Sequence, residues 1–187
     1  AQKVVHTSIA FSLVAGLVLA GVGFFLAEGL MILTKCPENA FAGAVGYMRI
    51  YFLGAPGILA YNFASAILRS KGDTRRPLYY LIASGVANIG LNLIFVAIFH
   101  LDALGVAIAT AASQYMAAGM TIYRLTKETD ACRFIPRETR IHAKELRDII
   151  RYGLASSVTN AMFSISNLQI QSAVNSYGDS AVAGNAA

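Results

Sequence analysis

The sequence predicts an all-α integral membrane protein, a polytopic helical bundle with about five transmembrane helices. Hydrophobic residues make up 56% of the 187 residues and charged residues only 13%, whereas soluble domains average about 25% charged residues. A large soluble helical protein is the alternative, but its buried helices are usually shorter and separated by more charge. Asp, Glu, Lys and Arg are absent from five windows, each close to the about 20 residues that a helix needs to cross a bilayer. These windows are 7–27, 50–68, 77–101, 103–123 and 152–178.

The positions of the basic residues predict how these spans are oriented. Lys and Arg near the ends of a span are retained on the cytoplasmic side of the membrane. All 15 basic residues except Lys35 and Arg49 lie before the first window or in the connections 69–76 and 124–151. We therefore expect a multi-pass protein of the plasma or inner membrane, with its amino terminus inside and its carboxyl terminus outside.

The first connection contains an acidic and a basic residue near the expected outer ends of two spans. Glu28 follows the first window and Arg49 precedes the second. An ion pair between them could close the outer face. The simpler arrangement, which we favour, is that each side chain extends separately to the headgroups. Within the second window, Pro56 frees a backbone carbonyl and predicts a kink.

The stretch ILRSKGDTRRPLYY, residues 67–80, predicts a cytoplasmic turn between the second and third spans. Gly72 can adopt the left-handed conformation that ends a helix, and Asp73 or Thr74 can cap the next one. Proline suits a first helical turn, and the two tyrosines that follow suit the headgroup depth. The turn residues that we single out are Arg69, Gly72, Asp73, Thr74, Arg75, Arg76 and Pro77.

Polar side chains recur along the fifth window at intervals of four, three, four and four residues, so they lie along one helical face. Two interpretations are open. The face could form hydrogen bonds between helices, or it could line a wet cavity near the bilayer midplane, where transporters bind their substrates. The candidate cavity-lining residues are Asn160, Ser164, Asn167, Gln171 and Asn175.

Catalytic chemistry is not predicted. His6, His100 and His142 are isolated in the sequence, and it contains no Glu-x-x-His motif, Gly-x-Ser-x-Gly motif or glycine-rich phosphate loop. We expect no enzyme activity, no cofactor and no metal site. The net charge of +5 lies at the expected membrane edges and therefore requires no nucleic-acid partner.

Three stretches resemble the multidrug and toxic compound extrusion (MATE) transporters. AILRSKGDTRRPLYY resembles the basic turn between the fourth and fifth helices of that family. ANIGLNLIFVAIFHLDALGVAIATAASQ is similar to the fifth and sixth helices, and FSISNLQIQSAVNSYGDSAVAGNAA to the seventh helix and the start of the eighth. The three matches follow the family's order and cover most of the chain.

The resemblance implies that the chain is part of a twelve-helix protein with two six-helix lobes. It would contain most of one lobe plus the first helix of the second. Residues 1–126 would belong to the amino-terminal lobe, 127–148 would form a cytoplasmic amphipathic linker, and 149–187 would begin the carboxy-terminal lobe. The linker mixes apolar and basic residues, as expected of a helix at the membrane surface. A natural five-span protein is the alternative.

The function that the resemblance implies is secondary active antiport. Such a protein would export organic cations or other amphipathic compounds, such as drugs and toxins, in exchange for Na⁺ or H⁺. Its partners would be the small-molecule substrate, the lipid bilayer and the remaining helices of the transporter. Two alternatives are a lipid-linked saccharide flippase of the same superfamily, which we expect to line its cavity with more charge, and a noncatalytic membrane scaffold.

The resemblance also implies a polar site in the amino-terminal lobe. The family places there an Asn, an Asp four residues later and a Thr in the next helix, together with an Asp from the first helix. Asn88, Asn92 and Thr110 match these positions in spacing. Asn92 carries an amide where many relatives carry a carboxylate, so it cannot itself bind and release a proton. We expect Asn88, Asn92 and Thr110 to form a cation or proton-relay site, with simple helix packing as the alternative.

The predicted topology can be checked by cysteine labelling. A cysteine introduced by Ser70→Cys should react with a membrane-impermeant maleimide only from the cytoplasmic side, whereas native Cys36 should react only from outside. The reason is that one span separates the two positions. Labelling of both cysteines from the same side would contradict the alternation of the spans.

Overall fold

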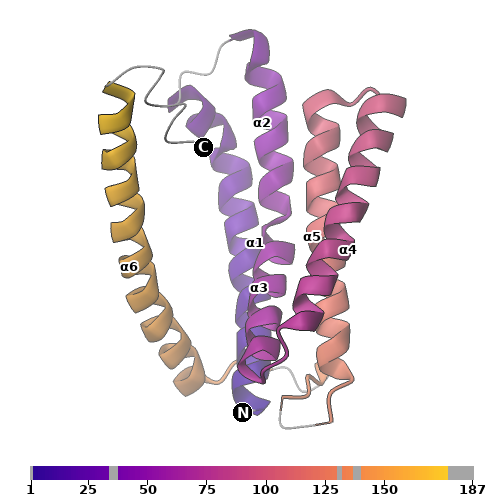
Figure 1. Ribbon diagram of the computed structural model, residues 1–187, viewed down its shortest axis with the longest axis vertical. Coiled ribbons are helices and arrows are strands. Elements are labelled where there is room, and N and C mark those ends of the chain that lie inside the picture. Colours follow the sequence, from indigo (N-terminus) through magenta and orange to yellow (C-terminus); the bar gives the residue numbers. More distant parts are fainter. Residues whose placement is uncertain (1, 34–37, 130–131, 137–139, 177–187) are drawn as a thin grey trace. The chain divides into compact units, whose positions relative to one another are not determined.

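The computed structural model describes residues 2–33, 38–129, 132–136 and 140–176. Its described part is helical throughout, with short turns and no strand, which confirms the predicted all-α class. The elements are α1 (Gln2–Leu33), α2 (Glu38–Leu53), α3 (Ala55–Ser70), α4 (Arg75–Leu93), the π-helical segment η1 (Ile94–Ile98), α5 (Asp102–Thr126) and α6 (Ala143–Ser176), as Figure 1 shows.

Four stretches of helix are long and apolar enough to cross a membrane: Gln2–Ile32, Phe41–Ser70, Arg75–Ile98 and Asp102–Thr126. They include nearly all of the first four uncharged windows and confirm a polytopic membrane protein. The fifth window falls largely within α6, which is not among these four stretches, so a fifth span stays a prediction.

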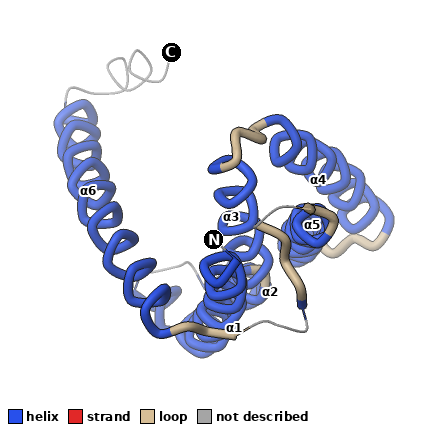
Figure 2. The backbone as a smooth tube through the Cα atoms, turned by 90° about the horizontal axis from the view of Figure 1, so that it is seen from below, coloured by secondary structure: helices blue, strands red, loops and turns tan. Residues whose placement is uncertain are grey.

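The chain divides into two compact units, Ala1–His142 and Ala143–Ala187. In the first unit, α1 packs against α2 and α3, and α5 packs against α2, α3 and α4. Figure 2 shows this unit end-on, with α5 between α4 and the other helices. The described part of the second unit is α6, which begins inside the expected linker 127–148. The assignment of lobes and linker stays a prediction.

The second span is interrupted near its middle, where the proline predicted a kink. α2 ends at Leu53 and α3 begins at Ala55, with Pro56 in the first turn of α3. Proline lacks an N–H and therefore leaves a carbonyl of the preceding turn without its helical donor. At this break the Tyr115 hydroxyl donates a hydrogen bond of 2.6 Å to the Leu53 carbonyl. A side chain of α5 thus bonds the backbone that the break exposes.

The helices of the first unit approach each other closely through glycine. A Cβ atom added to Gly16 of α1 would lie 2.4 Å from the Pro56 Cα, and one added to Gly57 would lie 3.0 Å from the Tyr115 backbone nitrogen. Membrane helices pack through small residues because these let the backbones come close. The contacts of α1 with α3, and of α3 with α5, therefore depend on positions without a side chain.

The turn between α3 and α4 has the predicted geometry. Gly72 has a positive φ of 84°, which is the left-handed conformation expected at the end of a helix. Of the two candidate caps, Asp73 is the residue that acts, because its carboxylate accepts a hydrogen bond of 3.2 Å from the Arg76 N–H. Thr74 occupies the cap position without a side-chain cap bond.

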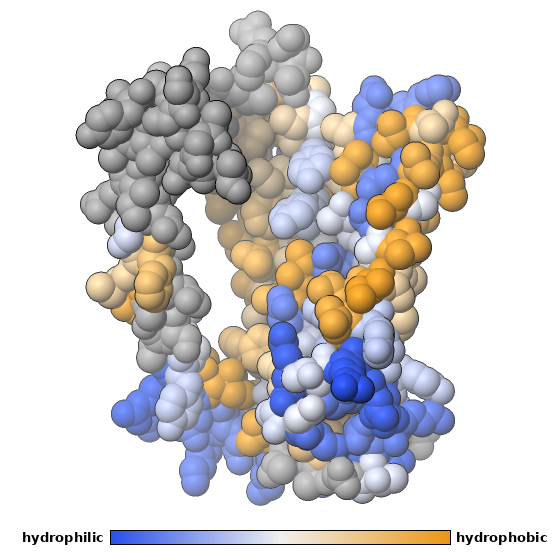
Figure 3. Space-filling model, viewed as in Figure 1, coloured by the Kyte–Doolittle hydropathy of each residue, from blue (hydrophilic) through white to orange (hydrophobic). Residues whose placement is uncertain are grey.

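Glu128, just after α5, is the centre of an ionic network with this turn. Its carboxylate lies 2.7 Å from the Lys71 ammonium, 2.8 Å from the Arg124 guanidinium and 3.7 Å from the Arg76 guanidinium. Arg76 also pairs with Asp73 at 3.3 Å. Figure 3 shows hydrophilic side chains concentrated at this lower end of the unit. The basic turn is therefore neutralised in part by an acid far away in the sequence.

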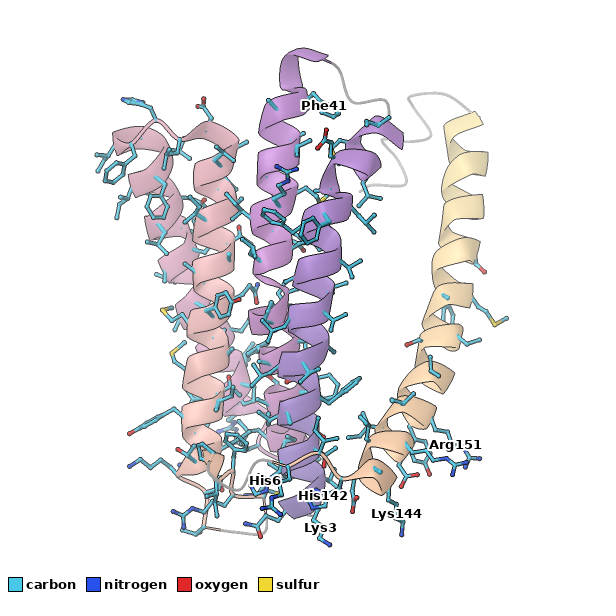
Figure 4. All side chains as sticks on the ribbon, turned by 180° about the vertical axis from the view of Figure 1, so that it is seen from behind. Lys3, His6, Phe41, His142, Lys144 and Arg151 are labelled. Atoms are coloured by element: carbon cyan, nitrogen blue, oxygen red, sulfur yellow. The ribbon has the colours of Figure 1, made fainter. Side chains whose placement is uncertain are left out.

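The segment after α5 is fastened to the start of α1. The buried His6 accepts a hydrogen bond of 3.1 Å from the Ile135 N–H and packs edge-on against the Phe134 ring. The fully buried Thr7 hydroxyl accepts a hydrogen bond of 3.2 Å from the His142 N–H. His6 and His142, isolated in the sequence, lie near each other in Figure 4. Both take part in fixing this segment.

The Glu128 network predicts a loss of stability on neutralisation. Glu128→Gln leaves three cations without their shared carboxylate and should lower the free energy of unfolding by about 2 kcal/mol, because the Glu128 side chain is only 12% exposed. Thermal unfolding in detergent micelles measures the effect. Asp148→Asn, an exposed acid on α6, is the matched control and should unfold like the wild type. Equal melting temperatures for both variants would contradict a stabilising network.

Candidate functional site

A chain of hydrogen bonds joins polar side chains of α4 and α5, which pack together in Figure 1. The side-chain nitrogen of Asn92 (Nδ2) donates a hydrogen bond of 3.0 Å to the side-chain oxygen of Asn88 (Oδ1). The Asn88 amide nitrogen donates to the Ser113 hydroxyl at 3.4 Å, and this hydroxyl donates to the Thr110 backbone carbonyl at 2.8 Å. All four residues are at least partly buried.

Three of the predicted site residues take different parts in this cluster. Asn88 and Asn92 are bonded directly, one helical turn apart. The Thr110 hydroxyl instead donates to the Val106 carbonyl of its own helix at 2.8 Å, so Thr110 joins the cluster through its backbone carbonyl. The sequence interpretation missed Ser113. Its spacing of three residues from Thr110 places both on one face of α5 and could have indicated it.

The hydrogen bonds run in one direction and leave an acceptor at one end. Asn92 donates to Asn88, Asn88 donates to Ser113, and Ser113 donates to the Thr110 backbone carbonyl. The side-chain oxygen of Asn92 (Oδ1) is buried and has no hydrogen-bond partner among the described residues. Leaving a buried acceptor unpaired typically costs about 1–3 kcal/mol. This oxygen is therefore placed to accept a hydrogen bond or to coordinate a cation.

Asn92 also lines an open apolar groove of about 340 Å³. Its other lining residues are apolar, and two of them belong to η1, the π-helical segment that continues α4. Segments of π-helix are rare and are found frequently at functional sites. The groove is lined by Ile89, Asn92, Leu93, Val96 and Ala97.

The expected cavity face of the fifth window lies on α6. The backbone of this helix is described as far as Ser176, but the side chains of the five candidate residues lie outside what the structure describes. Their role therefore stays a prediction. These residues are Asn160, Ser164, Asn167, Gln171 and Asn175.

The ion pair that the sequence offered as the less favoured arrangement is present near the ends of α1 and α2. The Arg49 guanidinium lies 3.4 Å from the Glu28 carboxylate. Its central carbon also lies 5.2 Å from the centroid of the Phe24 ring. The interpretation that the two side chains extend separately was wrong, because carboxylate and ring together hold the guanidinium.

Within the described ranges, no group of three or more His, Cys, Asp or Glu side chains could hold a metal ion. The polar atoms of the α4–α5 cluster are amide, hydroxyl and backbone carbonyl groups. These groups do not titrate near neutral pH. The cluster can therefore bind a cation through oxygen atoms, but its side chains do not themselves exchange protons.

Comparison with known proteins adds independent information. The family model described as MatE matches residues 1–94. The chain is 33% identical to the probable multidrug resistance protein YpnP of Bacillus subtilis over 162 residues, which are 87% of this chain and 36% of the relative. It is 30% identical to the probable multidrug resistance protein YoeA of the same organism over 189 residues, 97% of this chain and 41% of the relative.

A third relative comes from another bacterium. The chain is 28% identical to the probable multidrug resistance protein NorM of Thermotoga maritima over 153 residues, 77% of this chain and 32% of the relative. The chain thus spans well under half the length of each of these relatives. No solved structure gives a significant match.

The α4–α5 hydrogen bonds predict that Ser113 supports Asn88. Ser113→Ala removes the acceptor of the Asn88 amide and should lower the free energy of unfolding by about 1 kcal/mol, a typical value for such a bond. Denaturant unfolding in mixed micelles measures the change. Ser70→Ala is the control, because its exposed hydroxyl bonds only the Ile67 carbonyl of its own helix. A Ser113→Ala variant as stable as this control would show that Asn88 does not depend on the hydroxyl.

Proposed function

Since the chain belongs to the MatE family, the multidrug and toxic compound extrusion transporters, we propose that its protein is a secondary active exporter. The substrates would be organic cations or other amphipathic compounds, exchanged for Na⁺ or H⁺. The names of its relatives support multidrug export. The proposal concerns the whole protein, because alternating access requires two bodies that move around a shared site.

The unpaired Asn92 oxygen is the observation that carries the coupling part of this proposal. A buried amide oxygen at the end of a directed hydrogen-bond chain attracts a cation or a proton donor and does not attract an anion. Asn88 would hold the Asn92 amide with its oxygen free, and Ser113 would hold Asn88. Na⁺ could be coordinated by such an oxygen directly, whereas coupling to H⁺ would require a titratable group elsewhere.

The polar face of α6 is a second, separate candidate for contacts with the substrate. Transporters bind their substrates near the bilayer midplane at the interface of two repeats. We propose that the five polar residues of this face line that cavity, where hydroxyl and amide groups would contact the substrate or water.

The proposal predicts a loss of ion-driven export when the cluster is altered. The experiment uses the protein as encoded by its gene, reconstituted in proteoliposomes with ethidium and an imposed Na⁺ or H⁺ gradient. Asn88→Ala should reduce export by about tenfold, the effect of about 1.4 kcal/mol. Thr110→Ala should also reduce it, because in this proposal the Thr110 hydroxyl, which bonds the Val106 carbonyl in the structure, supplies an oxygen to the cation. Asn92→Asp should add a pH dependence, because a carboxylate titrates and an amide does not.

The matched control is Ser84→Ala on the same helix. Ser84 is buried, but its hydroxyl donates to the Leu81 carbonyl of α4 and lies outside the cluster. Export by this variant should equal that of the wild type. If the three cluster variants also export normally, with an unchanged pH profile, the cluster only supports packing. If the wild type moves ethidium under neither gradient, the proposed function is wrong.

A further inference from the structure

We propose that α1 and α2 carry between them a separate binding site for an organic cation, in which Arg49 of the chain occupies the place of the ligand. The site is formed by the Glu28 carboxylate and the face of the Phe24 ring, with an apolar pocket nearby. Its acidic and aromatic side chains lie on α1, whereas the Asn88 cluster lies on α4 and α5. The inference rests on the proposed export of organic cations and names a site where such a cation binds.

The chemistry around the Arg49 guanidinium is that of a site for an organic cation. A carboxylate oxygen lies 3.4 Å from one guanidinium nitrogen, and an aromatic ring lies beneath the group with its centroid at 5.2 Å. Aromatic faces attract cations, and quaternary ammonium compounds are recognised in this way. A planar or tetrahedral organic cation would make the same two contacts.

The contacts of the Arg49 guanidinium are weak enough for a ligand cation to replace it. The Arg49 side chain is 38% exposed and the Glu28 side chain 59% exposed, and exposed ion pairs contribute little to stability. The Arg49 Nε is buried without a hydrogen-bond partner among the described residues. A ligand that replaces the guanidinium therefore breaks a weak contact and relieves an unsatisfied donor. The charge beside Glu28 is the same before and after the exchange.

An apolar pocket of about 460 Å³ is lined by residues of α1, α2 and the start of α5. Met31 lies one helical turn after Glu28 on the same side of α1, and Met48 directly precedes Arg49. The volume is in the usual range for sites of small molecules, and methionine side chains adapt to ligands of different shape. The pocket suits the apolar body of an amphipathic cation. It is lined by Met31, Gly43, Ala44, Tyr47, Met48 and Ala103.

The test is equilibrium binding of ethidium to the protein as encoded by its gene, in proteoliposomes without an ion gradient. Arg49→Met removes the internal competitor and should tighten binding by roughly threefold to tenfold. Glu28→Gln removes the carboxylate and should weaken binding by a similar factor. Phe24→Leu should also weaken it. Arg49→Lys keeps a competing cation and should bind like the wild type.

The opposite signs separate a binding site from a structural ion pair. If the pair only stabilised the fold, Arg49→Met and Glu28→Gln would lower binding together or leave it unchanged, and either result would overturn the inference. Phe25→Leu is the matched control for Phe24→Leu, because Phe25 is 81% exposed and next in the chain. Its binding should equal that of the wild type, and a loss equal to that of Phe24→Leu would overturn the role of the Phe24 ring.

The same proteoliposomes can be used to test the proposed export function and the proposed binding site separately. Ethidium export by the wild type under an ion gradient tests the proposed function. If the wild type exports ethidium but the Arg49 and Glu28 variants do not change binding in opposite directions, only this inference fails. If binding changes as expected while export is absent, the site stands and the proposed function fails.

Discussion

A bilayer offers polar groups no water, so every N–H, carbonyl and hydroxyl within a span needs a partner inside the protein. The other features of the first unit depend on this requirement. The hydroxyls of Ser12, Ser84 and Thr121 donate to carbonyls of their own helices, and the break before Pro56 is bonded by Tyr115. Against this background the Asn92 side-chain oxygen and the Ser65 hydroxyl stand out, because both are buried without a hydrogen-bond partner among the described residues.

The bilayer also explains why glycine matters in the packing of the helices. Lipid tails are as apolar as leucine side chains, so helices in a membrane gain little by burying apolar surface and instead gain by close contact. Gly16 and Gly57 bring α1, α3 and α5 close enough for backbone atoms to touch. That contact keeps α5 firmly placed, and α5 in turn holds Ser113 against Asn88. The polar cluster therefore depends on glycines that lie far from it in the sequence.

Features that depend on neighbouring residues could be predicted from the sequence, and features that join distant residues could not. Four of the five uncharged windows correspond to apolar stretches of helix long enough to cross a membrane, and local chemistry predicted the roles of Gly72 and Asp73. The network around Glu128 was missed because, although Arg124 lies only four residues before it, nothing near it indicates that it also meets Lys71, 57 residues away. Ser113 was missed because serine is common in helix contacts. The prediction for Glu28 and Arg49 was wrong because sequence spacing does not show that the Phe24 ring lies beside the guanidinium and adds to the attraction.

The distance in sequence between Glu128 and the turn that it neutralises also has a consequence for biosynthesis. Chains emerge amino terminus first, so Lys71 and Arg76 leave the ribosome well before Glu128. While the hairpin of α3 and α4 enters the membrane, Glu128 cannot yet offset the positive charge from which we predict a cytoplasmic turn. Only after α5 has been made can the carboxylate bind them. In the predicted topology the same residues would first orient the turn and later bind Glu128 in the finished bundle.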